Sequence, residues 1–178
     1  IEFRWGERTW QHRQQCARDS GVIVHCVGPD GAFGNAFMIG FEAQMIEGGT
    51  GDIIVVPDTR PDVTPIGVSL CAETETDRDG ESVWKKGGAK KSFADGRINW
   101  FGRDEDWADT RGFRGKQDVE SPVGEWTRME VICDGGRITI LVNGVVVNEG
   151  FDASHAAGQI LLQTELAELF VRRWELRP

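Results

Sequence analysis

The sequence predicts an all-β fold, a sandwich or barrel of short antiparallel strands. Short runs of alternating apolar and polar residues recur along the chain, and turns rich in glycine separate them, with 23 glycines among 178 residues. Helical periodicity is nearly absent, because only residues 10–18 and 152–157 could form a turn or two of helix. Such a pattern is typical of sandwiches and barrels. A chain of this length usually forms one domain, so we expect a single domain over residues 1–178.

The first half of the chain begins inside a strand. In IEFRW the apolar residues Phe3 and Trp5 flank Arg4, as alternation in a strand requires. This abrupt start is consistent with the removal of a signal peptide or of a preceding strand. The turns GPDG at 28–31 and EGGTG at 47–51 separate later strands. We expect strands here at residues 1–6, 20–27, 39–46, 52–56 and 66–73.

The second half contains the strongest turn signal, the pair Asn143–Gly144 between ILV and VVV. Asn-Gly favours the two-residue turn of a hairpin, so residues 127–148 are predicted to form a three-stranded antiparallel meander. Strands are expected here at residues 97–101, 127–133, 137–142, 145–148, 159–165 and 168–176.

Residues 74–118 differ from the rest because they are dense in charge and glycine. They contain Trp84, Trp100 and Trp107, which favours packed loops over a flexible linker. The whole chain has seven tryptophans and no tyrosine. Tryptophan is common on sugar-binding surfaces, and core packing is the alternative for each one.

The composition excludes several kinds of partner. A net charge of −9 argues against nucleic acid and against an anionic membrane surface, since both require basic residues. No apolar run is long enough to span a membrane. Four cysteines, Cys16, Cys26, Cys71 and Cys133, lack CxxC spacing and leave both free thiols and disulfides open. A neutral substrate is compatible with this composition, and the oligomeric state is left undetermined.

Long polar side chains recur on one face of several predicted strands. Alternate residues of a strand point to opposite faces, so Glu42 and Gln44 share a face, opposite Phe41 and Met45. The same argument gives the full polar set: Arg4, His25, Glu42, Gln44, Gln163 and Glu165. If the strands are neighbours, these residues converge on one sheet and can bind hydroxyl groups. The alternative is that all of them are merely solvated.

Other kinds of site have weaker support. Glu42, Glu47, Asp52 and His25 could supply ligands to a divalent cation, but no calcium-loop spacing appears. No cofactor or metal site is therefore predicted, and a bound divalent cation stays an open alternative. The sequence also lacks a nucleophile elbow and a phosphate-binding glycine loop.

Four segments form an ordered pattern: RDSGVIVHCVGPDGAF, FEAQMIEGGTGDI, VESPVGEWTRMEVICDGGRITILVNGVVVNEG and GQILLQTELAELFVRRWELRP. They contain SG before a short apolar strand that ends in His, then E-x-Q, P-x-GEW, a strand pair around NG, and Q-T-E. In these features the chain resembles the 3-keto-disaccharide hydrolase domain family. It departs from the family pattern at Leu166, where Gly is usual, and at Ile54–Val55, where Trp–Leu is often found.

The resemblance implies a concanavalin A-like jelly roll of two antiparallel sheets, one of them concave, with long loops. It also implies a secreted or periplasmic bacterial enzyme that cleaves the glycosidic bonds of oxidised glycosides, so an oligosaccharide or glycoside is the expected partner. Laminarinase-type enzymes of this fold carry E-x-D-x-x-E, and residues 42–47 read E-x-Q-x-x-E. Parity places Glu47 on the face opposite Glu42 unless a bulge intervenes, so this spacing predicts no catalytic pair.

The chemistry implied by the family begins at the hydrogen on C2, which a ketone at C3 acidifies. A base removes it, the group at C1 departs, and water adds afterwards. We expect His25 as the base, since histidine titrates near neutrality, with Glu42 orienting it or acting as the base itself. Glu165 is the expected acid. Direct hydrolysis by Glu42 with Glu165 is a second route.

Substrate binding is expected from a further set of residues: Arg4, Gln44, Gln163 and Trp100. The same face with tryptophans at its rim would also suit a non-catalytic carbohydrate-binding module, which is the competing hypothesis. A third is an adhesion domain of the laminin-G type.

Overall fold

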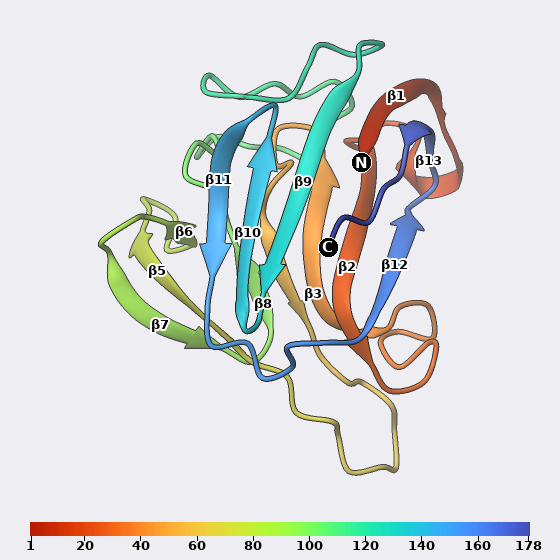
Figure 1. Cartoon of the computed structure of the whole chain (residues 1–178). Coiled ribbons are helices and arrows are strands. Elements are labelled where there is room, and N and C mark those ends of the chain that lie inside the picture. Colours follow the sequence, from red (N-terminus) through yellow and green to blue (C-terminus); the bar gives the residue numbers. More distant parts are fainter.

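Two antiparallel sheets of five strands face one another and form a sandwich (Figure 1). The computed structural model describes residues 1–178. The first sheet, in the order β11-β10-β9-β1-β13, consists of β1 (Glu2–Thr9), β9 (Thr127–Asp134), β10 (Arg137–Val142), β11 (Val145–Gly150) and β13 (Ala167–Arg173). The second, in the order β12-β2-β3-β4-β8, consists of β2 (Asp19–Val27), β3 (Ile39–Ile46), β4 (Ile53–Val56), β8 (Gly96–Ile98) and β12 (Gln159–Thr164). The all-β jelly-roll sandwich is thereby confirmed.

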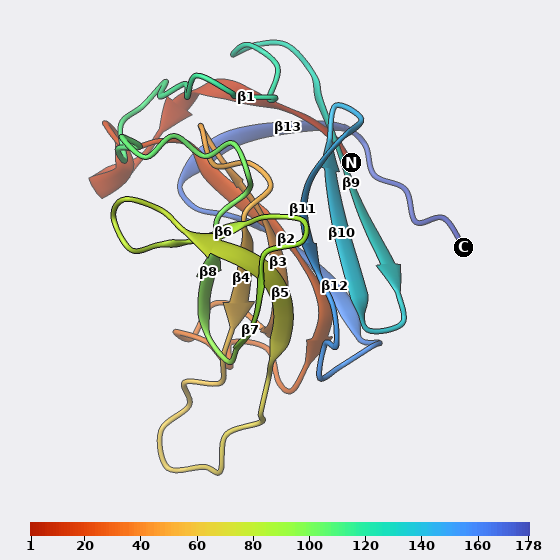
Figure 2. The same ribbon diagram turned by 90° about the vertical axis from the view of Figure 1, so that its left-hand side faces the viewer.

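A third, small sheet accounts for part of the segment that was predicted to be loops. Its order is β6-β5-β7, with β5 (Leu70–Thr76), β6 (Ser82–Trp84) and β7 (Ala89–Phe93). Figure 2 shows this sheet in front, beside β8 and β11. The prediction of irregular loops over residues 74–118 was wrong for the first half of this segment. The strands of the small sheet were missed because they are short and carry charged residues on their exposed faces. Residues 99–118 do form a long loop.

The helix expected within residues 10–18 is a single 3-10 turn, η1 (Gln11–Arg13), and residues 152–157 contain no helix. No helix of the chain has the length and apolarity that a membrane span requires.

Two turns show why particular residues stand where they do. Asn143 and Gly144 both have positive φ, +49° and +82°, as the predicted hairpin turn between β10 and β11 requires. Leu166 also has a positive φ of +55°, between β12 and β13. Glycine adopts this conformation without steric cost, which explains why the family pattern has Gly at this position.

The core lies between the two large sheets and consists of their inward faces. Each inward set alternates with outward residues, as expected for strands that bury one face. Its largest fully buried side chains include Phe3, Phe41, Met45, Trp100, Met129 and Ile140.

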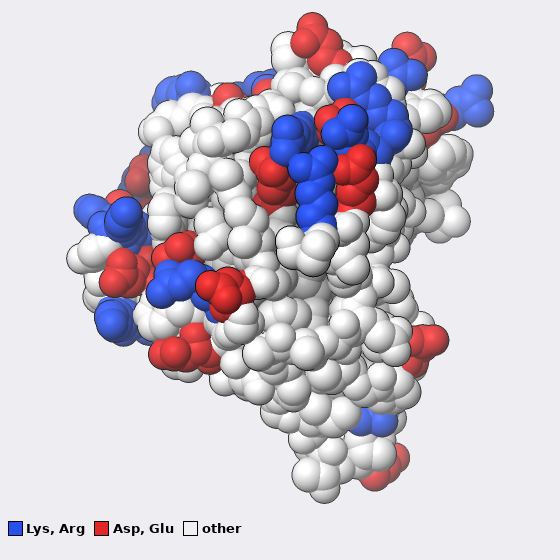
Figure 3. Space-filling model, in the orientation of Figure 1, with Lys and Arg blue, Asp and Glu red and all other residues white.

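The outward face of the first sheet carries charges that neutralise one another. Arg172 pairs with Glu2, at 2.6 Å, and Arg128 pairs with Glu130, also at 2.6 Å. Figure 3 shows blue and red atoms side by side on this face, with wide uncharged areas between the charged groups. Each of these charges therefore already has a partner of opposite sign.

Candidate functional site

The candidate site lies on the outward face of the second sheet, which points to the left in Figure 2. The register of the strands builds it in rows. Gly21 of β2 stands between Gln44 of β3 and Gln163 of β12. In the adjacent row, Ile23 stands between Glu42 and Leu161. Three short motifs of the sequence, SG, E-x-Q and Q-T-E, therefore meet on three neighbouring strands.

Gly21 makes room for the carboxyl group of Glu42. A Cβ atom at this position would overlap Glu42 Oε1, so any other residue would push the carboxyl away. Glycine weakens a strand interior by about 0.5–1 kcal/mol relative to alanine, so its presence here indicates a local requirement. The space over Gly21 lets Glu42 reach the neighbouring strand.

Two glutamines connect the carboxyl groups of this face. Gln163 Nε2 donates to Glu42 Oε1 at 2.7 Å and to Glu165 Oε1 at 3.2 Å. Gln44 Nε2 donates to Asp19 Oδ1 at 2.7 Å. The amide oxygens of Gln44 and Gln163 are buried and accept no hydrogen bond within the chain. Buried polar atoms rarely lack a partner, so these two open acceptors suit the hydroxyl groups of a ligand.

The pKa values of two carboxyl groups on this face, those of Glu42 and Asp19, are strongly raised. Burial raises the pKa of Glu42 to about 7, against the opposing hydrogen bond from Gln163, and the nearby Glu165 adds to the rise. Burial likewise raises the pKa of Asp19 to about 8, with Glu165 raising it further and Arg13 opposing. Arg13 Nη2 lies 3.3 Å from Asp19 Oδ2. Burial and the neighbouring Glu165 therefore both favour the protonated forms of Asp19 and Glu42.

A positive group completes the face. Arg97 of β8 pairs with Ile54 of β4, and Ile54 pairs in turn with Glu42 of β3. The three side chains therefore lie in one row on the same face of the sheet. Asp52 holds this arginine, with Arg97 Nη1 at 3.0 Å from Asp52 Oδ2. Asp52 is fully buried and also forms an ion pair with Arg103 from the 99–118 loop.

An apolar cluster adjoins the polar rows on the same face. It consists of Ile23, Cys26, Met38 and Val56, with Phe33, Phe37, Ile54 and Leu161 packed against them. This cluster gives one side of the site a dry, apolar surface.

Of the seven predicted site residues, the structure brings four together: Glu42, Gln44, Gln163 and Glu165. Their roles stay a prediction. Glu47, which parity had removed from the site, lies beyond the end of β3 and forms a buried ion pair with Arg18.

His25 does not share this face, so that prediction was wrong. A register shift between Val24 and Val27 interrupts the alternation of β2, and His25 has a φ of +51°. Its Nδ1 donates to the backbone oxygen of His155 at 2.8 Å, and its ring meets the inward-facing Phe41 edge-on at 6.4 Å. The irregularity places His25 at a hollow that residues of β9 and of the C-terminal segment also line.

Arg4 and Trp100 are also elsewhere, contrary to expectation. Arg4 belongs to β1 in the first sheet, where its guanidinium lies 5.0 Å from the ring centres of Trp126 and Phe170. Trp100 is only 1% exposed and belongs to the core. Parity gives the face of a strand but not the sheet to which it belongs, and composition does not separate buried from exposed tryptophan.

Asp19 and Arg97 were missed by the sequence interpretation. Parity could have found Asp19, because it stands two residues before Gly21 on the face already assigned to that strand. Arg97 is the first residue of the strand expected at residues 97–101, and it lies in the charge-rich segment 74–118, so nothing in its sequence context singled it out.

No group of three or more His, Cys, Asp and Glu side chains in residues 1–178 is arranged to hold a metal ion. The oxygens of Asp19 already accept hydrogen bonds from Gln44 and Arg13.

One of the comparisons with known proteins gives a match. The chain matches the family model described as a 3-keto-alpha-glucoside-1,2-lyase-like domain over residues 1–177. Neither the curated proteins nor the solved structures contain a match. Because the match spans nearly the whole chain, the chain belongs to the 3-keto-alpha-glucoside-1,2-lyase-like domain family.

Proposed function

We propose that this chain cleaves the glycosidic bonds of 3-keto-glycosides on the outward face of its second sheet. Membership of the family supports a carbohydrate-related function. The observation that carries the proposal is the buried Glu42 carboxyl, whose pKa is raised to about 7, beside Glu165 and two open amide oxygens. A general base works best when its pKa lies near the working pH, so Glu42 is suited to remove a proton at neutral pH.

The proposed reaction is an elimination followed by hydration. Glu42 takes the proton from C2, and the electron pair of that C–H bond forms an enolate with the C3 oxygen. The enolate then expels the oxygen bound to C1 and leaves a double bond between C1 and C2. Glu165 gives a proton to the departing oxygen. Water finally adds across the double bond and restores the 3-keto sugar.

The remaining polar groups bind the substrate and stabilise charge. The amide oxygens of Gln44 and Gln163 accept hydrogen bonds from sugar hydroxyls. Arg97 lies on this face and stabilises the negative charge that develops on the C3 oxygen. Asp52 fixes the guanidinium from the buried side, which keeps it oriented without competing for the substrate.

Direct hydrolysis is a second candidate because of the spacing of two carboxyl groups. One nitrogen of Gln163 donates to both Glu42 and Glu165, so the accepting oxygens lie within about 6 Å of each other. This is shorter than the roughly 6.5–9.5 Å of inverting glycosidases and close to the spacing of retaining ones. A retaining route would not need the ketone. Non-catalytic carbohydrate binding is the third candidate.

One experiment separates these candidates. The protein is incubated with a 4-nitrophenyl 3-keto-glucoside and with the matching unoxidised glucoside, as both anomers, and release of nitrophenol is followed. We expect release from the oxidised substrate alone, and deuterium at C2 should slow it. Equal release from both substrates would support direct hydrolysis instead, and binding without release from either would support a binding module.

Two parallel assays sharpen this experiment. Glu42→Gln and Glu165→Gln should each lose at least about 10²-fold in rate, whereas Glu7→Gln, an exposed strand glutamate without a side-chain partner, should retain full activity. A sample with chelator tests the open alternative of a divalent cation. The secreted or periplasmic location stays a prediction.

A further inference from the structure

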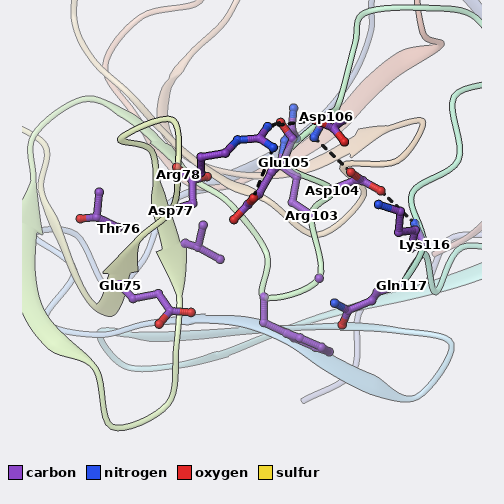
Figure 4. Close-up of a pocket in the computed structure, with 13 residues that line it drawn as sticks. Glu75, Thr76, Asp77, Arg78, Arg103, Asp104, Glu105, Asp106, Lys116 and Gln117 are labelled. Atoms are coloured by element: carbon purple, nitrogen blue, oxygen red, sulfur yellow. Dashed lines mark hydrogen bonds and ion pairs between the residues drawn. The ribbon is translucent and has the colours of Figure 1, made fainter.

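A hollow lies between the β5–β6 hairpin and the 99–118 loop (Figure 4). Its volume is about 530 Å³, within the usual range for small-ligand sites. Figure 4 shows Glu75 and Gln117 on opposite sides of the opening, with Arg78 and Lys116 farther along the rim. None of these residues belongs to the candidate site described above.

An exposed aromatic ring lies within this hollow. Phe101 is 40% exposed, although it is a large apolar side chain. Trp100 meets it edge-on at 5.3 Å, and Trp84 lies at 6.3 Å, so its position is fixed from behind. A rigid, accessible ring is a surface on which the apolar face of a sugar can stack.

Polar groups that lack partners surround this ring. The side chains of Thr76, Lys116 and Gln117 form no hydrogen bond within the chain, so they can bind a ligand without breaking existing contacts. Arg78, in contrast, is already paired with Asp79 and Asp106. Carboxylates outnumber cations around the hollow, which disfavours an anionic ligand and favours a neutral polyhydroxyl one.

The hollow is connected to the candidate site through one buried carboxylate. Arg103 lines the hollow and forms an ion pair with Asp52. The same Asp52 oxygen holds Arg97 on the catalytic face. A ligand bound over Phe101 therefore contacts the loop that shares this buried anchor with the site.

We propose that this hollow is a carbohydrate subsite, in which Phe101 stacks on a neutral sugar unit and Lys116 and Gln117 hydrogen-bond its hydroxyls. The subsite holds a sugar unit remote from the bond that is cleaved, so the substrate class is an oligosaccharide. This part of the inference rests on the proposed function. Substrates with several sugar units should bind more tightly than those with one.

The test is a binding measurement that needs no turnover. Isothermal titration of the wild-type protein with maltose-series and cellobiose-series oligosaccharides of two to four units gives their Kd values. We expect Phe101→Ala to weaken binding by about tenfold or more, and Lys116→Ala by a few-fold. Phe170→Ala is the matched control, since Phe170 is 41% exposed on the first sheet, and its Kd should stay within twofold of wild type.

The outcomes distinguish this proposal from the proposed function. Absence of binding by every oligosaccharide, or wild-type affinity in both Phe101→Ala and Lys116→Ala, would overturn the subsite. If Phe101→Ala fails to fold, as judged by circular dichroism, Lys116→Ala and Gln117→Ala decide the question. Intact oligosaccharide binding that these variants weaken, with no cleavage of any 3-keto-glucoside, would support the subsite and overturn the proposed reaction.

Discussion

Replacement of Glu42 by glutamine should abolish cleavage and, at neutral pH, make the protein more stable. The glutamine keeps the size of the side chain, and its amide oxygen can still accept the hydrogen bond from Gln163. The change removes only the ionisable group. Stability and activity should therefore move in opposite directions, as expected where a charge is buried for function.

The expected magnitude follows from the pKa of this carboxyl. Burial raises the pKa of Glu42 from 4.5 to about 7. At about 1.4 kcal/mol for each tenfold change in proton affinity, this corresponds to about 3 kcal/mol. Between pH 4.5 and about 7, the folded state retains a proton that the unfolded state has lost. The free energy of unfolding therefore falls as the pH rises through this window and levels off above it.

Urea unfolding at several pH values from 4.5 to 8, followed by tryptophan fluorescence, measures this effect. The variant should gain up to about 3 kcal/mol over the wild type as the pH rises from 4.5 to 8, less whatever Asp19 absorbs by titrating with it. Glu7→Gln, at an exposed position of β1, should show no such trend. A difference between variant and wild type that does not change with pH would refute the raised pKa, and full activity of the variant would refute the role as base.

Three further changes test the geometry of the site. Gly21→Ala should lower the rate of cleavage by at least about tenfold, because its Cβ displaces the Glu42 carboxyl, while Gly67→Ala, which has open space around it, should leave the rate unchanged. Asp52→Asn should lower the free energy of unfolding by about 3 kcal/mol, since it leaves buried arginine charge without a partner, and urea titration measures this loss. His25→Ala should keep kcat within a few-fold of wild type, and a loss of about 10²-fold would contradict the placement of this side chain away from the site.

The fold could be predicted because its signals are local. The strand pattern of residues 39–46 and the Asn143–Gly144 turn each follow from the properties of a few adjacent residues. The strands β6 and β7 could not be predicted in this way. They are three and five residues long, and the residues of β7 are mostly exposed, so neither contains a clear hydrophobic alternation.

The site was only partly predictable, because the alternation of side chains along a strand fails as a guide in two situations. It identified Glu42 and Gln44 correctly, since β3 is regular throughout. It failed at His25, because a register shift in β2 cannot be recognised from the identity of the residues around it. It failed at Arg4 for a different reason, since β1 lies in the other sheet and sheet membership depends on long-range pairing.

The family motifs gain a physical meaning when they are considered as one row of the sheet. The glycine of SG, the glutamine of E-x-Q and the glutamine of Q-T-E stand directly across from one another on β2, β3 and β12. The glycine lets the Glu42 carboxyl lie over β2, and Gln163 then reaches it from the far side. A larger residue at Gly21 would separate these two groups even if both were present. The three motifs therefore act together to hold the Glu42 carboxyl in a buried position. This shared role explains why the family pattern combines three segments that lie far apart in the sequence.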